Sequence, residues 1–220
     1  MANPAAPHGM NPVAYTNGAP WSGKANLYHI QSTDTIAYYI GDIMQLVPSG
    51  GANSSTHGSD ALGIPNVTGF ALGAVTAGSL VGPIVGVQVA PIGIGGAGAQ
   101  GQNVNLNLLS VPATKTFDYY VWIADDPNLV FEIQSDAVTT LANATTVGEN
   151  AGFTAAAPLT TFGPLSGTVL TGASLATTIT LPLKVVGLAM RPNVTLVSIN
   201  VPLLVRINTH QYVGAGTTGV

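Results

Sequence analysis

The sequence predicts an all-β protein, either a jelly-roll-like sandwich or a β-barrel, with an extended N-terminal arm and glycine-rich loops. Short runs of β-branched and aromatic residues recur along the 220 residues, separated by clusters of Gly, Pro, Asn and Ser. The 27 glycines and 15 prolines favour many turns and few long helices. These patterns are typical of antiparallel sandwiches and barrels, and we expect less than about one-tenth helix.

The stretch 117–134, FDYYVWIADDPNLVFEIQ, is predicted to be a β-hairpin in the core. Residues 117–123 are aromatic and β-branched, as in a well-buried strand. In residues 129–134, Leu129, Phe131 and Ile133 alternate with Val130, Glu132 and Gln134, the period-two pattern of a half-buried strand. Between them, Asp126-Pro127-Asn128 is a turn sequence, in which the Asp126 carboxylate can accept a hydrogen bond from the backbone two residues on. Large aromatic side chains concentrate here, so we expect Tyr119, Val121 and Ile123, or their alternates, to be buried.

Residues 1–24 are predicted to form an extended arm. They contain four prolines and no hydrophobic periodicity, so they cannot fold alone. Met10, Tyr15, Pro20 and Trp21 are the candidate contact residues along it. We expect the arm to leave the β-domain and to order against a neighbouring subunit; the alternative is a disordered terminus.

The rest of the chain is interpreted as one β-domain, residues 25–213, followed by a flexible tail, residues 214–220. The loops are expected at 48–66 and at the low-complexity segment 93–102. One turn of helix is expected within 136–143, capped by Ser135 or Asp136. Further strands are expected at 25–30, 35–40, 42–47, 67–75, 84–90, 104–109, 183–190 and 194–208. In the last of these, Val201, Leu203, Val205 and Ile207 share one face, and Pro202 suggests an edge or a bulge.

Charged residues are scarce. Five basic and nine acidic residues make up 6% of the chain, against roughly 25% in an ordinary soluble domain. So neutral a surface suggests that other protein covers much of it, and five basic residues argue against nucleic-acid binding. No cysteine is available for disulfides or thiolate metal sites. The N-terminus has no secretory-signal pattern, and glycine dilutes the best membrane candidate, residues 70–95, too strongly for a spanning helix.

No enzyme is predicted, and no catalytic, cofactor-binding or metal-binding residue is assigned. Asp125, Asp126 and Asn128 supply oxygens that calcium prefers, but a turn explains all three, and we favour the turn. The four histidines have no metal-ligand spacing, and His29 and His210 are expected to be hydrogen-bonded surface groups. The glycines of 93–101 lack the strand-to-helix context of a dinucleotide site.

Four blocks of sequence resemble a family of structural proteins encoded in the head-gene region of tailed bacteriophages. They are the opening MANP…GMNPVAYTNGAPWSGKANLYHI, IGD at 40–42, DDPNLVFEIQSD at 125–136 and the ending INTHQYVGAGTTGV at 207–220. The resemblance implies a capsid decoration, or cement, protein with a jelly-roll-like or barrel-like fold. Such a protein binds the outside of an icosahedral shell and clamps neighbouring major capsid subunits. Residues 61–115 and 150–183 depart from the family in being poorer in charge.

We therefore expect a structural virion protein, made in the host bacterial cytoplasm, located on the outer capsid surface and homo-oligomeric as a dimer or trimer. Its expected partners are the phage major capsid protein and itself, with no nucleic acid and no membrane. One alternative is another phage structural protein, a major capsid or tail component. The other is a carbohydrate-binding or adhesin β-module that uses exposed aromatic side chains, for which the candidates are Trp21, Tyr119, Tyr120 and Trp122.

Overall fold

The computed structural model describes residues 3–47, 63–75, 77–89, 108–116, 118–141, 143–158, 164–192 and 194–213. Within these ranges the chain is nearly all β, which confirms the predicted fold class. The helical elements described are α1 (Asn143–Thr146) and the 3-10 turn η2 (Gly172–Ser174). The strands are β1 (Asn11–Tyr15), β2 (Asn26–Ile30), β3 (Tyr38–Tyr39), β4 (Ile43–Leu46), β5 (Val67–Thr68), β6 (Gly73–Val75), β7 (Gly82–Val89), β8 (Ser110–Val111), β9 (Tyr119–Ile123), β10 (Leu129–Gln134), β11 (Asn150–Ala151), β12 (Phe153–Ala155), β13 (Val169–Leu170), β14 (Leu183–Leu188) and β15 (Pro202–Ile207).

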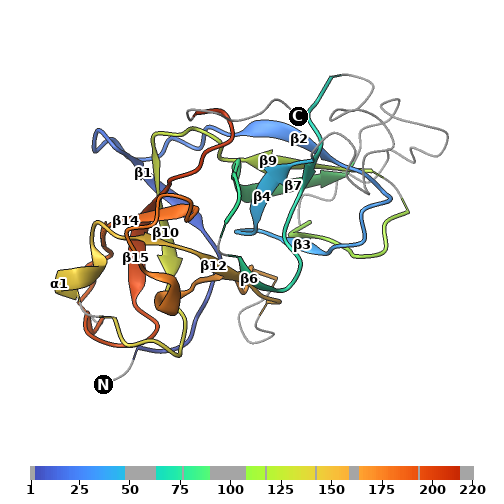
Figure 1. The fold of residues 1–220 in the computed structure, drawn as a ribbon. Coiled ribbons are helices and arrows are strands. Elements are labelled where there is room, and N and C mark those ends of the chain that lie inside the picture. The colour runs from blue at the N-terminus through green and yellow to red at the C-terminus, as the bar shows by residue number, and fades with distance from the viewer. Residues whose placement is uncertain are drawn as a thin grey trace.

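One half of the molecule is an antiparallel five-stranded sheet in the order β1-β10-β15-β14-β11 (Figure 1). Its inner face buries alternate residues of the central strands, because successive side chains of a strand point to opposite faces. Phe131 on β10, Val185 on β14 and Val205 on β15 are fully buried there. The predicted shared face of Val201, Leu203, Val205 and Ile207 is confirmed, since all four are buried. We call this cluster the sheet core.

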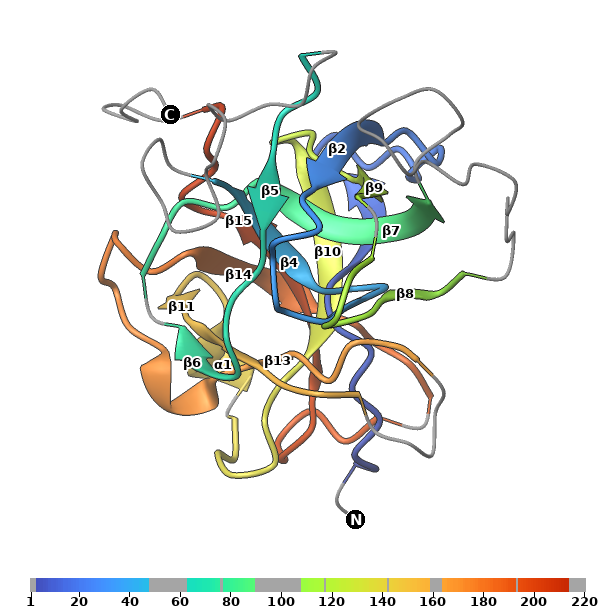
Figure 2. The same ribbon diagram turned by 90° about the vertical axis from the view of Figure 1, so that its right-hand side faces the viewer.

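The other half is a five-stranded sheet in the order β2-β9-β7-β4-β5 that nearly closes into a barrel. Its two ends meet where His29 of β2 forms a parallel bridge with Asn66, next to β5, and donates its backbone N–H to the Pro65 carbonyl at 2.9 Å. Figure 2 shows β2 and β5 side by side at the top of the molecule. Closure encloses a second cluster, the barrel core, which includes Tyr28, Met44, Leu46, Val67, Ile84, Val121 and Ile123.

Two small sheets lie beside the larger ones. β12 pairs with both β13 and β6, and β3 pairs with β8. Phe153 of β12 is buried in the sheet core and meets the ring of Phe70 edge to face. This contact packs the three-stranded sheet against the loop that follows β5.

The predicted hairpin of 117–134 is wrong in its pairing, although its strands and its turn are present. β9 lies between β2 and β7, whereas β10 lies between β1 and β15 in the other sheet. The turn forms as expected: the Asn128 N–H donates to Asp126 Oδ1 at 2.9 Å, and the Leu129 N–H donates to the Asp126 carbonyl at 3.1 Å. Both strands are central in their sheets, which explains why both are rich in buried side chains.

The expectation that residues 1–24 leave the β-domain is also wrong for the part that is described. β1 pairs with the edge of β10, and Met10 is fully buried in the sheet core. Residues 16–21 then fold back on β1, with an antiparallel bridge between Ala14 and Pro20. Pro12 is tolerated because β1 is the edge strand of its sheet. The segment is thus ordered by pairing with β10 and with its own residues 19–21.

Residues 3–9 run across the outer face of the same sheet, held there by amide side chains. The Asn3 side chain donates to the Thr195 and Ile199 carbonyls and accepts from the Thr195 N–H. Gln134 donates to the Pro4 carbonyl at 3.1 Å and accepts from the Ala6 N–H at 2.9 Å. A proline-spaced segment without regular hydrogen bonds is therefore fixed by side chains from its own domain.

Smaller expectations are corrected as well. Asp136 does not cap a helix within 136–143; its carboxylate accepts from the N–H groups of Val138, Thr139 and Gly172, and the helical turn begins at Asn143. Pro202 is the first residue of β15, which is a central strand and not an edge strand. His29 and His210 are buried. The glycine-rich segment 93–102, the tail 214–220 and most of the expected strand 104–109 lie outside the described residues.

No helix in the described part of the chain has the length and hydrophobicity that crossing a membrane requires.

Candidate functional site

A pocket of about 390 Å³ opens between three segments that are far apart in the sequence. One wall is the segment 35–43 around β3, and the second is the loop 69–72 that leads into β6. The third is formed by Phe153 and Ala155 of β12, by the next two residues, 156 and 157, and by Thr168. Its apolar lining consists of Ile36, Ala37, Ile43, Phe70, Ala71, Leu72, Phe153, Ala155, Ala156 and Ala157. Its other lining residues are Thr35, Tyr38, Tyr39, Asp42, Gly69 and Thr168.

The aromatic walls of the pocket are fixed by close packing. The rings of Phe70 and Phe153 meet edge to face, with centroids 5.2 Å apart, a geometry that aromatic pairs favour. Tyr38 lies directly on Gly69, where an added Cβ would stand 2.5 Å from its Cε1 atom. Only a residue without a side chain leaves room for the ring at this point, so Gly69 sets the position of Tyr38.

Asp42 places a carboxylate in the wall of this pocket. The tight turn Tyr39–Asp42 presents it: the Asp42 N–H donates to the Tyr39 carbonyl at 3.0 Å, and Gly41 between them has a φ of +92°. Asp42 Oδ2 accepts the Tyr39 N–H at 2.8 Å, and Oδ1 accepts the hydroxyls of Ser166 at 2.5 Å and Thr168 at 3.4 Å. Burial raises the pKa of Asp42 to about 6, because desolvation disfavours the charged form more than these hydrogen bonds favour it.

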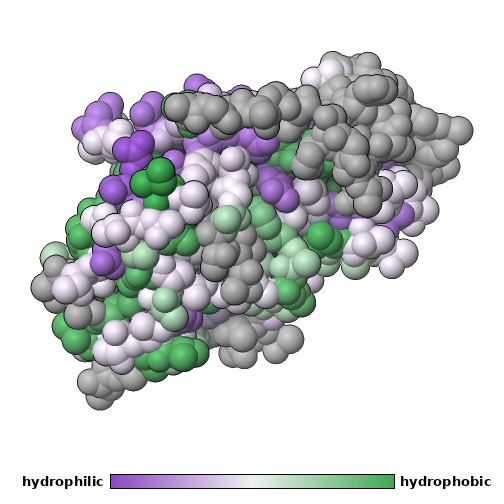
Figure 3. Space-filling view, in the orientation of Figure 1, coloured by the Kyte–Doolittle hydropathy of each residue, from purple (hydrophilic) through white to green (hydrophobic). Residues whose placement is uncertain are grey.

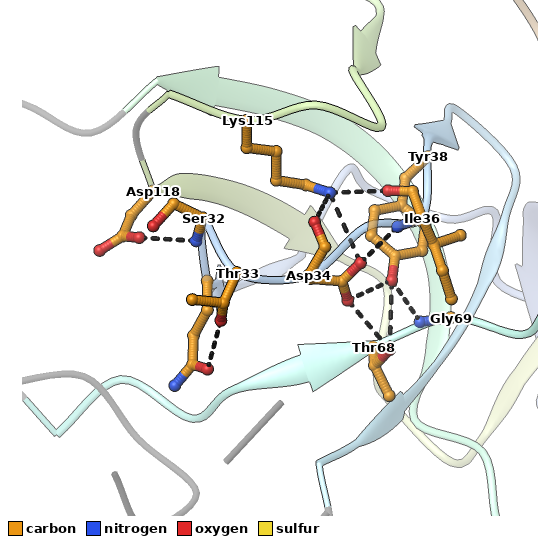
Figure 4. Close-up of polar contacts among 10 residues, drawn as sticks. Ser32, Thr33, Asp34, Ile36, Tyr38, Thr68, Gly69, Lys115 and Asp118 are labelled. Carbon is orange, nitrogen blue, oxygen red and sulfur yellow. Dashed lines mark hydrogen bonds and ion pairs between the residues drawn. The ribbon is translucent and has the colours of Figure 1, made fainter. Parts of the chain in front are cut away.

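Behind the pocket, Tyr38 joins a buried polar cluster centred on Asp34 (Figure 4). The Tyr38 hydroxyl and the Thr68 hydroxyl both donate to Asp34 Oδ2, at 2.6 and 3.1 Å. The Lys115 ammonium donates to the carbonyls of Asp34 and Ile36 at 2.6 and 2.7 Å and lies 3.5 Å from Asp34 Oδ1. Burial lowers the pKa of Lys115, and the Asp34 charge opposes that shift. The cluster ties the segment after β2 to β5 and to the segment after β8.

Sequence reasoning assigned no role to Asp34, Asp42 or Lys115. One signal was available for Lys115: it ends a stretch without charge that begins after Asp60. Lysine side chains are mostly exposed, so this position is unusual in the sequence but does not by itself predict burial against an acidic partner. The identity of that partner, 81 residues away, depends on the fold.

The oxygens considered for calcium have structural roles. Asp125 accepts hydrogen bonds from the Asn26 amide at 2.9 and 3.0 Å and from the Tyr28 hydroxyl at 2.6 Å. Asp126 forms the turn described above. Among the described residues, no group of three or more His, Asp or Glu side chains is arranged to hold a metal ion.

The four candidate interface residues do not form one exposed face. Met10 is fully buried, and Tyr15 and Trp21 are half-buried against the sheet core. The Trp21 indole N–H donates to the Lys24 carbonyl at 3.1 Å. Pro20 alone is exposed.

The aromatic residues considered for sugar binding are likewise dispersed. Tyr120 is buried, Tyr119 packs against the barrel core, and Trp21 packs against the sheet core. Trp122 is 40% exposed and lies over Gly86 of the neighbouring strand, where an added Cβ would stand 3.3 Å from the indole. Its ring therefore covers a glycine in the sheet, and the four side chains form no common platform.

The surface has little charge and several exposed hydrophobic side chains. Asp34, Lys115 and Glu132 are buried, which removes three of the few charged residues from the surface. In Figure 3, several hydrophobic patches, separated by more polar surface, lie over the part of the molecule where Figure 1 shows α1, β14 and β15. The exposed hydrophobic residues contributed by the segments in and around these elements include Val138, Val147, Val186, Met190 and Val197.

Comparison with known proteins found no matching protein-family model, no matching curated protein and no matching solved structure.

Proposed function

We propose that this protein is a structural component of a virion, a capsid decoration protein that binds the outside of a tailed-phage head and stabilises contacts between major capsid subunits. The observation that carries the proposal is the surface: it is poor in charge and has exposed hydrophobic side chains around α1, β14 and β15. Surfaces of this kind are stabilised when another protein covers them. The four sequence blocks that resemble phage head proteins favour the major capsid protein as that partner.

The proposed mechanism needs no catalytic group. A protein that binds only the assembled shell stabilises that shell by mass action. Contacts with more than one capsid subunit strengthen the effect, because the second contact forms at a high effective concentration. The half-buried aromatic residues and the dispersed indoles give no corresponding support to a carbohydrate-binding module.

Binding to purified empty shells tests the proposal. The protein should co-sediment saturably with shells, and mass spectrometry should find it in mature particles at hundreds of copies. Because the exposed contacts are mainly apolar, we expect occupancy to change little as salt is raised from about 0.1 M to 1 M, where the Debye length falls to about 3 Å. Absence from mature particles, together with no shell binding, would refute the assignment.

A pair of matched surface variants locates the contact. Val138→Ser with Met190→Ser changes two of the most exposed hydrophobic residues near α1 and β14 and should lower shell occupancy at limiting concentration. Leu109→Ser with Val213→Ser changes two exposed hydrophobic residues elsewhere and should leave occupancy unchanged. Equal occupancy for both double variants would show that this hydrophobic surface is not the contact.

A further inference from the structure

The pocket beside Asp42 has the size and lining of a small-molecule site. Its volume of about 390 Å³ falls within the roughly 300–1,000 Å³ common for ligand pockets. Most of its lining is aliphatic or aromatic, and a few polar groups converge on one side, around Asp42 and Thr168. A ligand with an apolar body and one polar end would match this distribution of side chains.

The polar end of the pocket lacks a positive charge. The groups that donate hydrogen bonds to Asp42 are the Tyr39 N–H and the hydroxyls of Ser166 and Thr168, all of them neutral. The ion pairs found in the described part of the chain join Glu132 to His8 and Arg191, Asp118 to His29, and Asp34 to Lys115. None of them includes Asp42, so no basic side chain of the described residues pairs with its carboxylate.

The remaining walls favour a cation over an anion. Tyr38, Tyr39, Phe70 and Phe153 all contribute to the lining, and aromatic faces attract ammonium groups. An anion would meet the Asp42 carboxylate and no compensating positive side chain in the lining. The other titratable residues of the lining are Tyr38 and Tyr39, and burial against Asp34 raises the pKa of Tyr38, which keeps it neutral.

Nearby charges outside the lining are already paired. Asp34 and Lys115 lie behind Tyr38 and bind each other. His8, whose carbonyl packs against Gly41, has its ring 3.8 Å from Glu132.

We propose that this pocket binds a small organic cation, a primary amine with a compact apolar or aromatic body, whose ammonium pairs with the Asp42 carboxylate. The amine donates to the carboxylate beside the Ser166 and Thr168 hydroxyls, and its apolar body packs among Phe70, Phe153 and the alanines of 155–157. The site is independent of shell binding and goes beyond the proposed structural role.

Three probes with one apolar body and different ends test the charge preference. Calorimetric titrations of the full chain at about pH 7.5 would use 3-phenylpropylamine, 3-phenylpropan-1-ol and 3-phenylpropionate. The amine should bind, the alcohol should bind about tenfold more weakly, and the carboxylate should show no binding. Lowering the pH below about 6 should weaken binding of the amine and leave binding of the alcohol unchanged, because Asp42 then becomes protonated.

Two variants and a control connect binding to the pocket. Asp42→Asn should reduce amine affinity to that of the alcohol and leave the alcohol unchanged. Ala71→Phe fills the pocket from an exposed position and should abolish binding of both the amine and the alcohol. Val213→Phe adds the same ring at an exposed position outside both the lining and the proposed shell contact and should have no effect. Circular dichroism of each variant confirms that it is folded.

Several outcomes would overturn the inference. Equal binding of amine and carboxylate, or unchanged amine affinity in Asp42→Asn, would exclude the proposed pairing. If no probe binds while Ala71→Phe lowers shell occupancy, the pocket receives a side chain of a protein partner instead, and the small-cation site is excluded.

Discussion

Lys115 and Asp34 form a charge pair in which both side chains are almost completely excluded from water, at 0% and 2% exposure. Removing one member of such a pair leaves the other as an uncompensated buried charge, which costs about 3–5 kcal/mol. We therefore expect Lys115→Met to lower the free energy of unfolding by about that amount. Urea unfolding at neutral pH measures it, with Lys184→Met as the control, because the hydrogen bond from the Lys184 ammonium to the Gly148 carbonyl is exposed to solvent. Similar small losses in both variants would show that the buried pair contributes little.

Asp42 should make stability depend on pH in an unusual direction for a carboxylate. Its pKa is raised from 3.8 to about 6, so between these values the folded protein holds a proton that the unfolded chain releases. The free energy of unfolding therefore falls as the pH rises from about 4 to about 6 and then levels off, a change on the order of 3 kcal/mol. Asp42→Asn cannot titrate, so the stability of the wild type minus that of the variant should decrease over this range. A difference that stays flat from about pH 4 to pH 7 would contradict the burial described for Asp42.

At the scale of secondary structure, the N-terminal segment gives a direct test. Deleting residues 2–20 removes β1 from the edge of β10 and Met10 from the sheet core. Loss of Met10 alone should cost about 2–5 kcal/mol, and the uncovered edge of β10 offers a site for self-association. We expect a lower melting temperature by circular dichroism and larger species by size-exclusion chromatography.

A matched pair of point variants separates burial from pairing in the same segment. Met10→Ser should be strongly destabilising, whereas Val13→Ser, at an exposed position of β1, should change stability by less than about 0.5 kcal/mol. A truncated protein that remains monomeric with the wild-type melting temperature would show instead that this segment is dispensable for the fold.

The elements that the sequence predicted well depend on local pattern. The alternation from Val201 to Ile207 correctly indicates the buried face of β15, because the period of a strand is a property of neighbouring residues. In β9 the expectation holds for Val121 and Ile123, whereas Tyr119 is half-buried and Tyr120 is buried. Which strands pair is a property of distant residues. The five-residue link between β9 and β10 can close a hairpin or cross between sheets, and its turn chemistry is the same in both cases.

The candidate site illustrates the same limit. Asp42, Phe70, Phe153 and Thr168 are brought together by three segments, and nothing in the residues next to any one of them indicates the others. Three of the four aromatic residues considered for sugar binding, by contrast, lie in the stretch where aromatics concentrate, and packing occupies most of that stretch. Concentration of aromatics along a sequence therefore marked the core of this protein and not its pocket.

The described part of the molecule has two hydrophobic cores, and some residues of the barrel strands belong to the sheet core. Ile43 of β4, Leu80 before β7 and Ala124 after β9 belong to the sheet core, although they come from strands or strand ends of the barrel. Opening either half would expose these residues, so we expect the two halves to unfold together in one cooperative transition.

The two tryptophans allow this to be measured, because each reports on one half. Trp21 packs against the sheet core, and Trp122 lies on the barrel strand β9. Trp122→Phe leaves Trp21 as the only indole, and Trp21→Phe leaves Trp122. For each variant, the urea midpoint followed by fluorescence should coincide with the midpoint followed by far-ultraviolet circular dichroism, which sees both sheets. The opposite result is a Trp21 midpoint and a Trp122 midpoint that lie on opposite sides of the circular-dichroism midpoint. The barrel and the sheet would then unfold independently, and the residues shared between the two cores would not couple them.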